Sequence, residues 1–469
     1  MLSKFLVSIV SFCVTTVLNP LFAATNQQIN KRIEYFQKQI NQFKIQKKQS
    51  QNKLTYRYYY QKCICPNGTS IYHISHVGIG PYLNTQEAFN VSTLIINTPT
   101  IREDAWILLN QYQLAEKCSG MGIPTFPLPQ ITFSGKLEGQ VGYKSTYSGS
   151  RTVNINFSGA ELDTYLQKNL WVSGYISLDY DPNELVDGSD VFINRAFLTI
   201  GNLSRFPFYI SIGQVYVPFG RYNSLMISSP VTLGLGRTRA RAVTVGYQTN
   251  KNTVHAEIYG YQELTNNLSS SNQNNQWGMD IGYEFNNGGQ VSGEVGASLI
   301  SNLADSEGMQ STVFLHNKIL DHNIQAINFY GSFSINTMVF IAEYVGALRS
   351  FDISNDIRFA NQSIICRPTA FHTEANYTFH IASKVSSLGI GYDHTGQSLA
   401  LGLPQERYSI FYNVNIWRDT NFALEYRHDV NYSRNSTTIR IHSIYPFSGI
   451  TDDFSKSNNV VMAQFDLYF

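Results

Sequence analysis

The sequence predicts an all-β protein, a 16-stranded antiparallel transmembrane β-barrel preceded by a short helical, coiled-coil-like periplasmic N-terminal segment. Three observations lead to this prediction. Segments of alternating apolar and polar residues recur from residue 131 to residue 469, which is the period of a strand with two unlike faces. Short and long connections alternate between these segments, and a stretch typical of a secretion signal precedes them.

The composition agrees with a membrane protein built from strands. Charged residues make up only 14% of the chain and aromatic residues 13%, whereas soluble domains are about 25% charged. No apolar run reaches the roughly 20 residues that a transmembrane helix needs. A net charge of +1 gives no reason to expect a nucleic-acid partner.

Residues 1–23 have the organisation of a secretory signal peptide. Lys4 supplies the positive charge, Phe5–Leu18 is the apolar stretch, and Pro20 ends it. Small and apolar residues up to Ala23 offer a cleavage site. We therefore expect cleavage after Ala23 and export of the remaining chain.

Residues 24–53 are predicted to form an amphipathic or coiled-coil helix. Apolar residues recur there at spacings of four and three, which is an a/d stripe over about two heptads: Ile29, Ile33, Phe36, Ile40 and Phe43. Such a helix can pack on the rest of the protein or form a small coiled coil between subunits. Contact with anionic lipid head groups or with peptidoglycan is a third interpretation.

Residues 54–130 are interpreted as an irregular periplasmic segment that ends in a proline-rich linker. An exported chain can hold disulfides, and Cys63, Cys65 and Cys118 are the candidates. We expect a bond from Cys63 or Cys65 to Cys118, because these residues share one region. Cys366 lies in a predicted external loop far from the others.

A metal site in this segment is not expected. Cys63, Cys65, His73 and His76 could be written as four ligands. However, a single residue between two cysteines is tight for a tetrahedral zinc site, which usually has two or more. An oxidising compartment also favours a disulfide.

Residues 131–469 contain the predicted barrel. In its first strand Phe133, Leu137 and Val141 alternate with polar residues such as Lys136 and Glu138. Seven short turns interleave with eight long loops along this region, which gives sixteen strands. Short periplasmic turns and long external loops are typical of outer-membrane barrels, whose closed sheet satisfies every backbone group within lipid.

The last strand also indicates a protein of the outer membrane. Val461, Ala463, Phe465, Leu467 and Phe469 are its apolar face. A final strand that ends in phenylalanine resembles the signal read by the outer-membrane assembly machinery. The expected partners are therefore this machinery and outer-membrane lipid, and the expected location is the outer membrane of a Gram-negative cell.

The connection within Gly213–Tyr247 holds the candidate ligand-binding residues. Arg237, Arg239 and Arg241 occupy alternate positions and are expected to share one face, in the lumen or above the membrane, because an arginine in lipid costs about 2–4 kcal/mol. Arginine suits bidentate contact with carboxylates. An anion-attracting patch is therefore predicted from Tyr216, Arg221, Tyr222, Arg237, Arg239 and Arg241.

The alternative is that these arginines only set the electrostatic field of the pore or pair with acidic residues such as Glu257. The pattern leaves open whether residues 217–238 fold into the lumen and whether residues 54–130 enter the barrel. No ordered Ser–His pair suggests catalysis, so we expect no enzyme activity, no cofactor and no resident metal.

Three blocks resemble the LbtU-type siderophore porins, a family known from Legionella with the FslE and FupA proteins of Francisella as relatives. They are GQVYVPFGRYNSLMISSPVTLGLGRTRARAVTVGY at 213–247, LWVSGYISLDYDP at 170–182 and INRAFLTIGNL at 193–203. The order of parts is similar as well. The resemblance implies iron acquisition across the outer membrane through a barrel without the plug of TonB-dependent receptors.

The expected cargo is a ferric siderophore of the polycarboxylate type. The first alternative is a high-affinity channel for ferrous iron, in which acidic groups of the lumen attract the cation: Glu138, Asp179, Asp280, Glu284, Glu294, Glu343, Glu374 and Glu425. The second alternative is a general diffusion porin.

Overall fold

The computed structural model describes seventeen parts of the chain. They are Gln61–Ile64, Ser70–His73, 101–120, 128–145, 149–181, 191–249, 254–262, residue 264, 266–267, 275–287, 291–312, 319–320, 322–356, 362–382, 384–417, 420–433 and 455–468. The predicted signal peptide and the helix over 24–53 lie outside these residues. The chain divides into two compact units, Met1–Ser75 and His76–Phe469. In the first unit, β1 (Gln61–Ile64) pairs with β2 (Ser70–His73) as an antiparallel hairpin.

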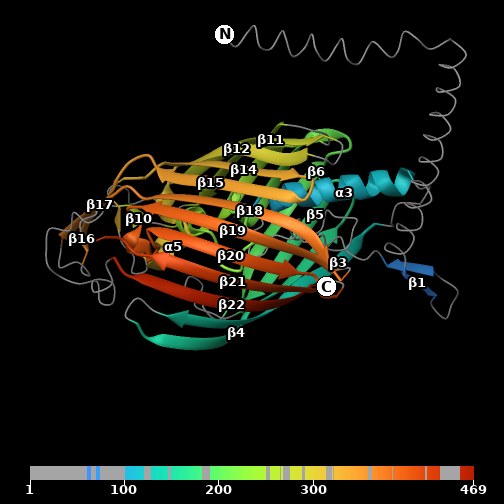
Figure 1. The fold of residues 1–469 in the computed structure, drawn as a ribbon. Helices are drawn as coiled ribbons and strands as arrows, with labels where there is room; N and C mark the ends of the chain where they lie inside the picture. The colour runs from blue at the N-terminus through green and yellow to red at the C-terminus, as the bar shows by residue number, and fades with distance from the viewer. Residues whose placement is uncertain are drawn as a thin grey trace, which may run out of the picture. The chain divides into compact units, whose positions relative to one another are not determined.

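The second unit is a closed barrel of sixteen antiparallel strands, as predicted (Figure 1). Strands adjacent in sequence are paired, and the last strand returns to the first from Asn459↔Ser145 to Tyr468↔Lys136. The strands are β3 (Gln130–Ser145), β4 (Arg151–Gln167), β5 (Val172–Tyr180), β6 (Val191–Asn202), β7 (Phe206–Tyr216), β8 (Arg239–Tyr247), β9 (Val254–Gln262), β11 (Asn275–Asn287), β12 (Val291–Ile300), β14 (Ala326–Ile335), β15 (Met338–Ala347), β18 (Thr369–Ile381), β19 (Lys384–Gly396), β20 (Glu406–Val414), β21 (Thr420–Val430) and β22 (Ser457–Tyr468).

The two faces of each strand are those that the alternation predicts. In β11, Met279 and Ile281 are 44% and 54% exposed on the outside, whereas Asp280 is 2% exposed on the inside. Side chains alternate across a strand, so the register of β11 places Met279 and Ile281 outward and Asp280 inward. The lumen is therefore polar and the outer surface apolar, the reverse of a soluble protein.

The connections at the two ends of the barrel differ in length and content. The long ones contain α4 (Val231–Gly236), α5 (Glu307–Thr312), two short 3-10 turns at Leu303–Asp305 and Leu399–Leu401, and two small sheets. One sheet pairs β10 (Asn266–Asn267) with β13 (Ile319–Leu320), and the other pairs β16 (Phe351–Asp356) with β17 (Gln362–Cys366). Figure 1 shows β10, β16, β17 and α5 toward one end of the barrel and the C-terminus at the other.

The prediction of an irregular segment over 54–130 was wrong at its C-terminal part, which forms the helix α3 (Glu103–Gly120). Glu103 and Asp104 lie in its first turn, where carboxylates favour a helix N-terminus. Its apolar residues are too evenly spread for a clear stripe, which is why periodicity did not reveal it. Ala105, Leu108 and Leu109 pack against Leu203 and Tyr209 of the barrel. No helix of the described residues is both long and apolar enough to cross a membrane.

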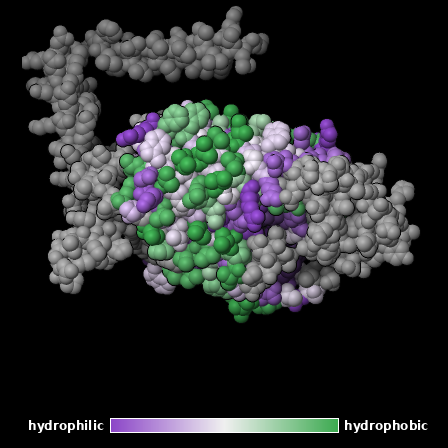
Figure 2. All heavy atoms as spheres, turned by 180° about the vertical axis from the view of Figure 1, so that it is seen from behind, coloured by the Kyte–Doolittle hydropathy of each residue, from purple (hydrophilic) through white to green (hydrophobic). Residues whose placement is uncertain are grey.

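Large apolar side chains are exposed on the outer surface of the strands and form an apolar belt, and many of them gather on the face seen in Figure 2. Aromatic rings contact one another near its two edges, as in the interfacial girdles of outer-membrane barrels. The pairs nearer the short turns are Phe206–Phe208, Tyr283–Phe285 and Trp417–Phe465, and those nearer the long connections are Phe157–Tyr180 and Tyr392–Tyr408.

This belt predicts the cost of a charge at its centre. Ile281→Arg places a guanidinium on the lipid-facing side of β11 and should reduce the free energy of unfolding by about 2–4 kcal/mol. Urea unfolding of the protein in phospholipid vesicles measures the difference. Ile281→Ala, which removes the same side chain without adding charge, is the control and should cost clearly less. Equal effects of the two substitutions would contradict a lipid-facing Ile281.

Candidate functional site

The long connection over residues 217–238, here called the lumen loop, folds into the barrel. Its backbone and side chains bond to wall residues from strands spread around the lumen. Near the start of the loop, the Gly220 amide donates to the Ser298 hydroxyl of β12 at 2.8 Å. This answers the question that the sequence left open, and it makes the loop part of the lumen rather than an external binding surface.

Three glutamates of the wall hold the backbone of the lumen loop. Glu343 of β15 accepts from the amides of Arg221 at 2.8 Å and Tyr222 at 2.9 Å. Glu374 of β18 accepts from the Leu225 amide at 2.9 Å, and Glu425 of β21 accepts from the Ser228 amide at 2.8 Å. Hydrogen bonds to ionised acceptors are about twice as strong as those between neutral groups. These contacts therefore attach the loop firmly to the wall.

Hydroxyls of the loop add to all three of these contacts, and the Thr232 hydroxyl donates to Glu343 at 3.2 Å. Ser224 donates its hydroxyl to Glu374, and Ser228 donates its hydroxyl to Glu425. Each of these carboxylates thus receives one amide and one hydroxyl from a single residue or a neighbouring pair. The SLMISS stretch of the sequence is therefore matched to the glutamates of the wall, although they lie about 150–200 positions later in the chain.

Gly220 gives the loop its sharp turn after Pro218. Its φ is +82°, and a Cβ there would lie 2.5 Å from Asn328 Nδ2 and 2.7 Å from Glu343 Oε1. A larger residue would therefore both strain the backbone and displace Glu343. The remainder of the loop packs in an apolar core with Val217, Phe219, Val231 and Leu235.

Arg221, one of the predicted ligand-binding residues, lies inside the lumen and is fully engaged by the wall. Its Nε donates to Glu294 Oε1 at 2.9 Å, and its Nη2 donates to Asp280 Oδ2 at 2.8 Å and to the Tyr330 hydroxyl at 2.7 Å. Its guanidinium carbon lies 4.1 Å from the centre of the Tyr330 ring. The alternative interpretation, in which the arginine pairs with acidic groups across the lumen, describes this contact.

Tyr216, Arg237 and Arg239 come together where the lumen loop enters and leaves the wall. The Arg237 guanidinium lies 4.8 Å from the centre of the Tyr216 ring. Glu307 of α5 pairs with Arg237 Nε at 2.6 Å and with Arg239 Nε at 3.3 Å. Glu307 therefore balances one of the two positive charges of this group.

The other two predicted residues are placed apart from this group. Tyr222 is completely buried in the lumen loop, and its hydroxyl has no hydrogen-bond partner among the described residues. Arg241 lies on the outer face of β8 with Val243 and Val245. The single face predicted for Arg237, Arg239 and Arg241, in the lumen or above the membrane, is not observed. Arg237 and Arg239 pair with Glu307, whereas Arg241 is exposed on the outer face of β8.

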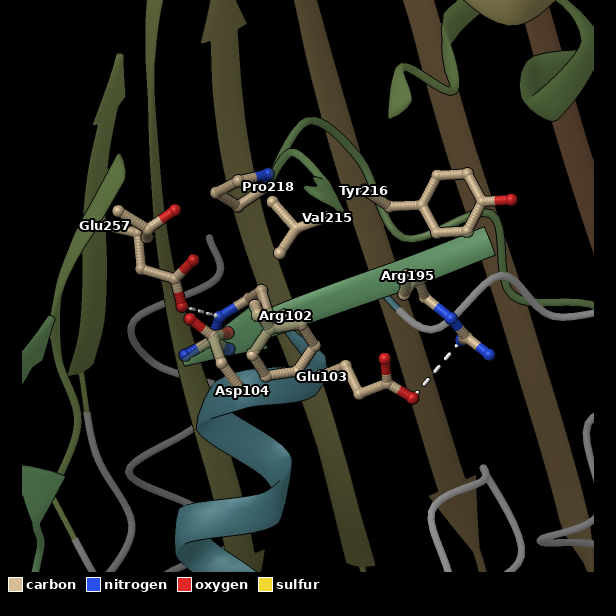
Figure 3. A pocket seen from close by; sticks show the side chains of 10 residues that line it. Arg102, Glu103, Asp104, Arg195, Val215, Tyr216, Pro218 and Glu257 are labelled. Atoms are coloured by element: carbon tan, nitrogen blue, oxygen red, sulfur yellow. Dashed lines mark hydrogen bonds and ion pairs between the residues drawn. The ribbon is translucent and has the colours of Figure 1, made fainter. Parts of the chain in front are cut away.

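The start of helix α3 packs into the end of the barrel that carries the short turns, and the residues Ile101–Leu109, which comprise the turn before α3 and its first part, are here called the plug segment. Arg102 is 2% exposed. Its Nε donates to Glu257 and its Nη2 donates to Gln248 Oε1 at 2.7 Å. Figure 3 shows Arg102 and Glu103 at the start of α3, directed toward Glu257 and Arg195 of the wall.

Two acidic residues of the plug segment carry an electrostatic cost. Burial raises the pKa of Glu103 to about 7 despite the Arg195 guanidinium at 3.2 Å. Burial also raises the pKa of Asp104 to about 6, with the nearby Glu257 adding to the effect. The sequence could not reveal these two groups, because nothing in their spacing places them inside a barrel.

A small cavity of about 10 Å³ remains between the plug segment and the lumen loop (Figure 3). Arg102, Glu103, Arg195, Pro218 and Glu257 are among its lining residues. This volume holds about one water molecule, so little free space is left between the plug segment and the lumen loop at this point.

His255, Glu284 and Glu294 offer ligand atoms within 4.8 Å of one another beside this cavity wall. The expected absence of a metal site rested on Cys63, Cys65, His73 and His76, and it did not consider this group. The side chains of the disulfide candidates Cys63, Cys65 and Cys118 lie outside the described residues. Cys366 of β17 is a half-buried free thiol, and burial raises its pKa to about 11.

A closed antiparallel barrel with an apolar outer belt and a polar lumen defines the class of transmembrane β-barrels of the outer-membrane type. The chain is 60% identical to a UPF0422 protein of Coxiella burnetii over 474 residues, which cover all of both chains. It is 33% identical to a UPF0422 protein of Legionella pneumophila over 412 residues, covering 83% of this chain and 76% of the relative. The chain belongs to the UPF0422 family.

No family model matches the chain. Among solved structures, the outer membrane channel DcaP of Acinetobacter baumannii is 13% identical with a TM-score of 0.49, covering 73% of this chain and 97% of that one. OmpF of Salmonella typhi, solved in complex with daunomycin, is 12% identical with a TM-score of 0.47, covering 73% of this chain and 98% of that one.

The grip on the lumen loop predicts the effect of neutralising one wall glutamate. Glu343→Gln keeps one acceptor oxygen for two backbone amides and removes the charge, which should cost about 1.5–3 kcal/mol of loop attachment. Single-channel recording of the purified protein in planar bilayers should then show conducting events about tenfold or more as often as in the wild type.

Asp466→Asn is the matched control for this measurement. Asp466 also faces the lumen, but its carboxylate accepts hydrogen bonds from the wall residues Asn421 and Gln464. The substitution likewise replaces a lumen carboxyl by an amide. The attachment of the loop by Glu343 is refuted if both variants conduct equally often.

The raised pKa values of Glu103 and Asp104 predict that the plug segment docks more firmly at acidic pH. The docked segment holds protons that the undocked one, with carboxyl pKa values near 4.5 and 3.8, releases. Its stability is therefore greatest below about pH 4 and falls as the pH rises through 6 and 7. Hydrogen exchange of the α3 amides, corrected for intrinsic rates, should be faster at pH 8 than at pH 5.

Glu103→Gln tests this origin of the pH dependence, because it removes the larger contribution while keeping the shape of the side chain. The variant should show a smaller difference between pH 5 and pH 8. Exchange in the wild type that does not change with pH would show that the two carboxyls do not control docking.

Proposed function

We propose that the protein is a gated uptake channel of the Gram-negative outer membrane that serves iron acquisition. The observation that carries this proposal is the closed lumen. A sixteen-strand barrel is wide enough for an aqueous channel, yet the lumen loop and the plug segment fill it. Both are held by ion pairs and hydrogen bonds, which can exchange with a charged solute more readily than a packed apolar core can.

The charge of the lumen wall favours a cationic cargo. Carboxylates of the wall outnumber its cations by more than two to one among the described strands. The carboxylates are Glu138, Glu161, Asp163, Asp179, Glu257, Asp280, Glu284, Glu294, Glu343, Glu374, Asp393, Glu425, Asp429 and Asp466, and the cations are Lys136, Arg195, Arg239, Arg407 and Arg427. Walls of one sign with low dielectric constant concentrate ions of the opposite sign. Ferrous iron is therefore the cargo that the geometry supports best.

The ferric siderophore is the second candidate. The resemblance to the LbtU-type siderophore porins supports it, as does the group of Tyr216, Arg237 and Arg239 at the long-connection end of the barrel. Against it, Glu307 pairs with both arginines and Arg221 is committed to Asp280 and Glu294. A polycarboxylate ligand would have to displace these carboxylates. A general diffusion porin is the least consistent with a lumen closed in this way.

Radioactive iron uptake by a deletion strain and its parent tests the proposal. Iron is supplied once as ferrous ion and once as the ferric siderophore, both at limiting concentration. We expect the deletion to reduce ferrous uptake severalfold and the wild-type gene to restore it. Complementation with the double variant Arg237→Ala/Arg239→Ala should restore ferrous uptake too, because both arginines pair with Glu307 of α5.

Each alternative outcome identifies a different cargo. Loss of siderophore-bound uptake alone, with no recovery by the double arginine variant, would replace ferrous iron by the siderophore. Unchanged uptake of both forms would overturn the role in iron acquisition and leave only a gated channel.

A further inference from the structure

We infer that His255, Glu284 and Glu294 form a binding site for a divalent transition-metal ion in the lumen, and that Arg102 of the plug segment competes with the metal for it. The inference deepens the proposed function and rests on it only for the identity of the cargo. The three side chains come from the adjacent strands β9, β11 and β12, and each offers a ligand atom within 4.8 Å of the others.

Two buried atoms of the cluster, one from His255 and one from Glu284, lack hydrogen-bond partners among the described residues. His255 is completely buried. Its Nδ1 atom and the Glu284 Oε1 atom have no hydrogen-bond partner among the described residues, although they lie only 3.5 Å apart. Leaving two buried polar atoms unsatisfied costs free energy. An ion between them would satisfy both.

The distance between these two atoms suits two ligands of one metal ion. Nitrogen and oxygen ligands lie about 2.1 Å from Zn²⁺ in proteins, so two ligands of one tetrahedral ion are about 3.4 Å apart. The observed 3.5 Å between His255 Nδ1 and Glu284 Oε1 fits this spacing. An imidazole with carboxylates suits first-row transition metals, whereas Ca²⁺ and Mg²⁺ prefer oxygen alone.

The groups around the three ligands carry an excess of negative charge. Four carboxylates, Glu257, Asp280, Glu284 and Glu294, surround only two guanidinium groups, those of Arg102 and Arg221. The carboxylates outnumber these guanidiniums by two. Buried charges are stable only when they are paired or coordinate a metal, and a divalent cation supplies the two missing positive charges.

Arg102 links the site to the closure of the barrel. Its Nη1 lies 3.7 Å from Glu284 Oε1 and 3.8 Å from Glu294 Oε1, so it is a tethered cation beside two of the three ligands. A metal ion and this guanidinium therefore oppose each other, and each weakens the binding of the other by the same factor. The Glu284 side chain is 27% exposed, which gives an ion a way to the site.

Isothermal titration of the purified full-length protein in detergent with Co²⁺ tests the site. We expect binding in the wild type, at least tenfold weaker binding in Glu284→Gln, and at least tenfold tighter binding in Arg102→Gln, because that variant removes a positive charge beside the ligands. A gain of affinity is not a result that misfolding produces. Asp466→Asn, elsewhere in the lumen, is the control and should bind like the wild type.

Hydrogen exchange gives a second readout, in which saturating Co²⁺ should accelerate exchange of the α3 amides in the wild type but not in Glu284→Gln. Equal affinities of the wild type, Glu284→Gln and Arg102→Gln would overturn the inference. If the deletion strain nevertheless lost ferrous uptake, the proposed function would stand without this site. Metal binding that follows the expected order of affinities, with unchanged iron uptake by cells, would support the site and overturn only the proposed cargo.

Discussion

The hydrogen bonds from the lumen loop to the carboxylates of the wall are the interaction on which the closed state of this barrel depends. An inward-facing carboxylate in a polar lumen costs little while water reaches it. Once a loop displaces the water, the same group must be satisfied by the loop itself. Glu343 meets this condition with the amides of Arg221 and Tyr222. The loop therefore cannot close the lumen in an arbitrary conformation, but only in one that directs its amides at these glutamates.

Most of the barrel could be predicted because its strands obey one local rule. The alternation that places Ile281 outward and Asp280 inward is visible in a few consecutive residues, and it depends on lipid outside and polar groups inside rather than on distant partners. The lengths of the connections then separate the two ends. Helix α3 escaped this reasoning, because its place is decided by Leu203 and Tyr209, which lie about a hundred positions away.

The candidate site was predicted less well, for a physical reason. The arginines of the stretch 213–247 are visible in the sequence, but the acidic groups that neutralise them come from other strands. Arg221 meets Asp280 and Glu294, and Arg237 meets Glu307. Alternation also failed locally, because it assumes a strand already in register, whereas Arg237 precedes β8 and Arg239 begins it. The arginines of the sequence therefore identified the connection that folds into the lumen, but they did not reveal which acidic residues each arginine contacts.

In the proposed channel, the carboxylates that hold the lumen loop and the plug segment would also attract a cationic cargo, and these two roles are opposed. Arg102 and Arg221 are positive groups of the chain itself, placed where a cation entering the lumen would also be most stable. As long as they occupy these positions, they offset part of the negative charge of the acidic wall and help to hold the plug segment and the lumen loop in the barrel. A mobile cation of sufficient charge lowers the free energy of the wall in the same way and makes the tethered arginines dispensable. Selectivity and opening would then be consequences of one exchange, with the charge of the cargo replacing the charge of the plug segment.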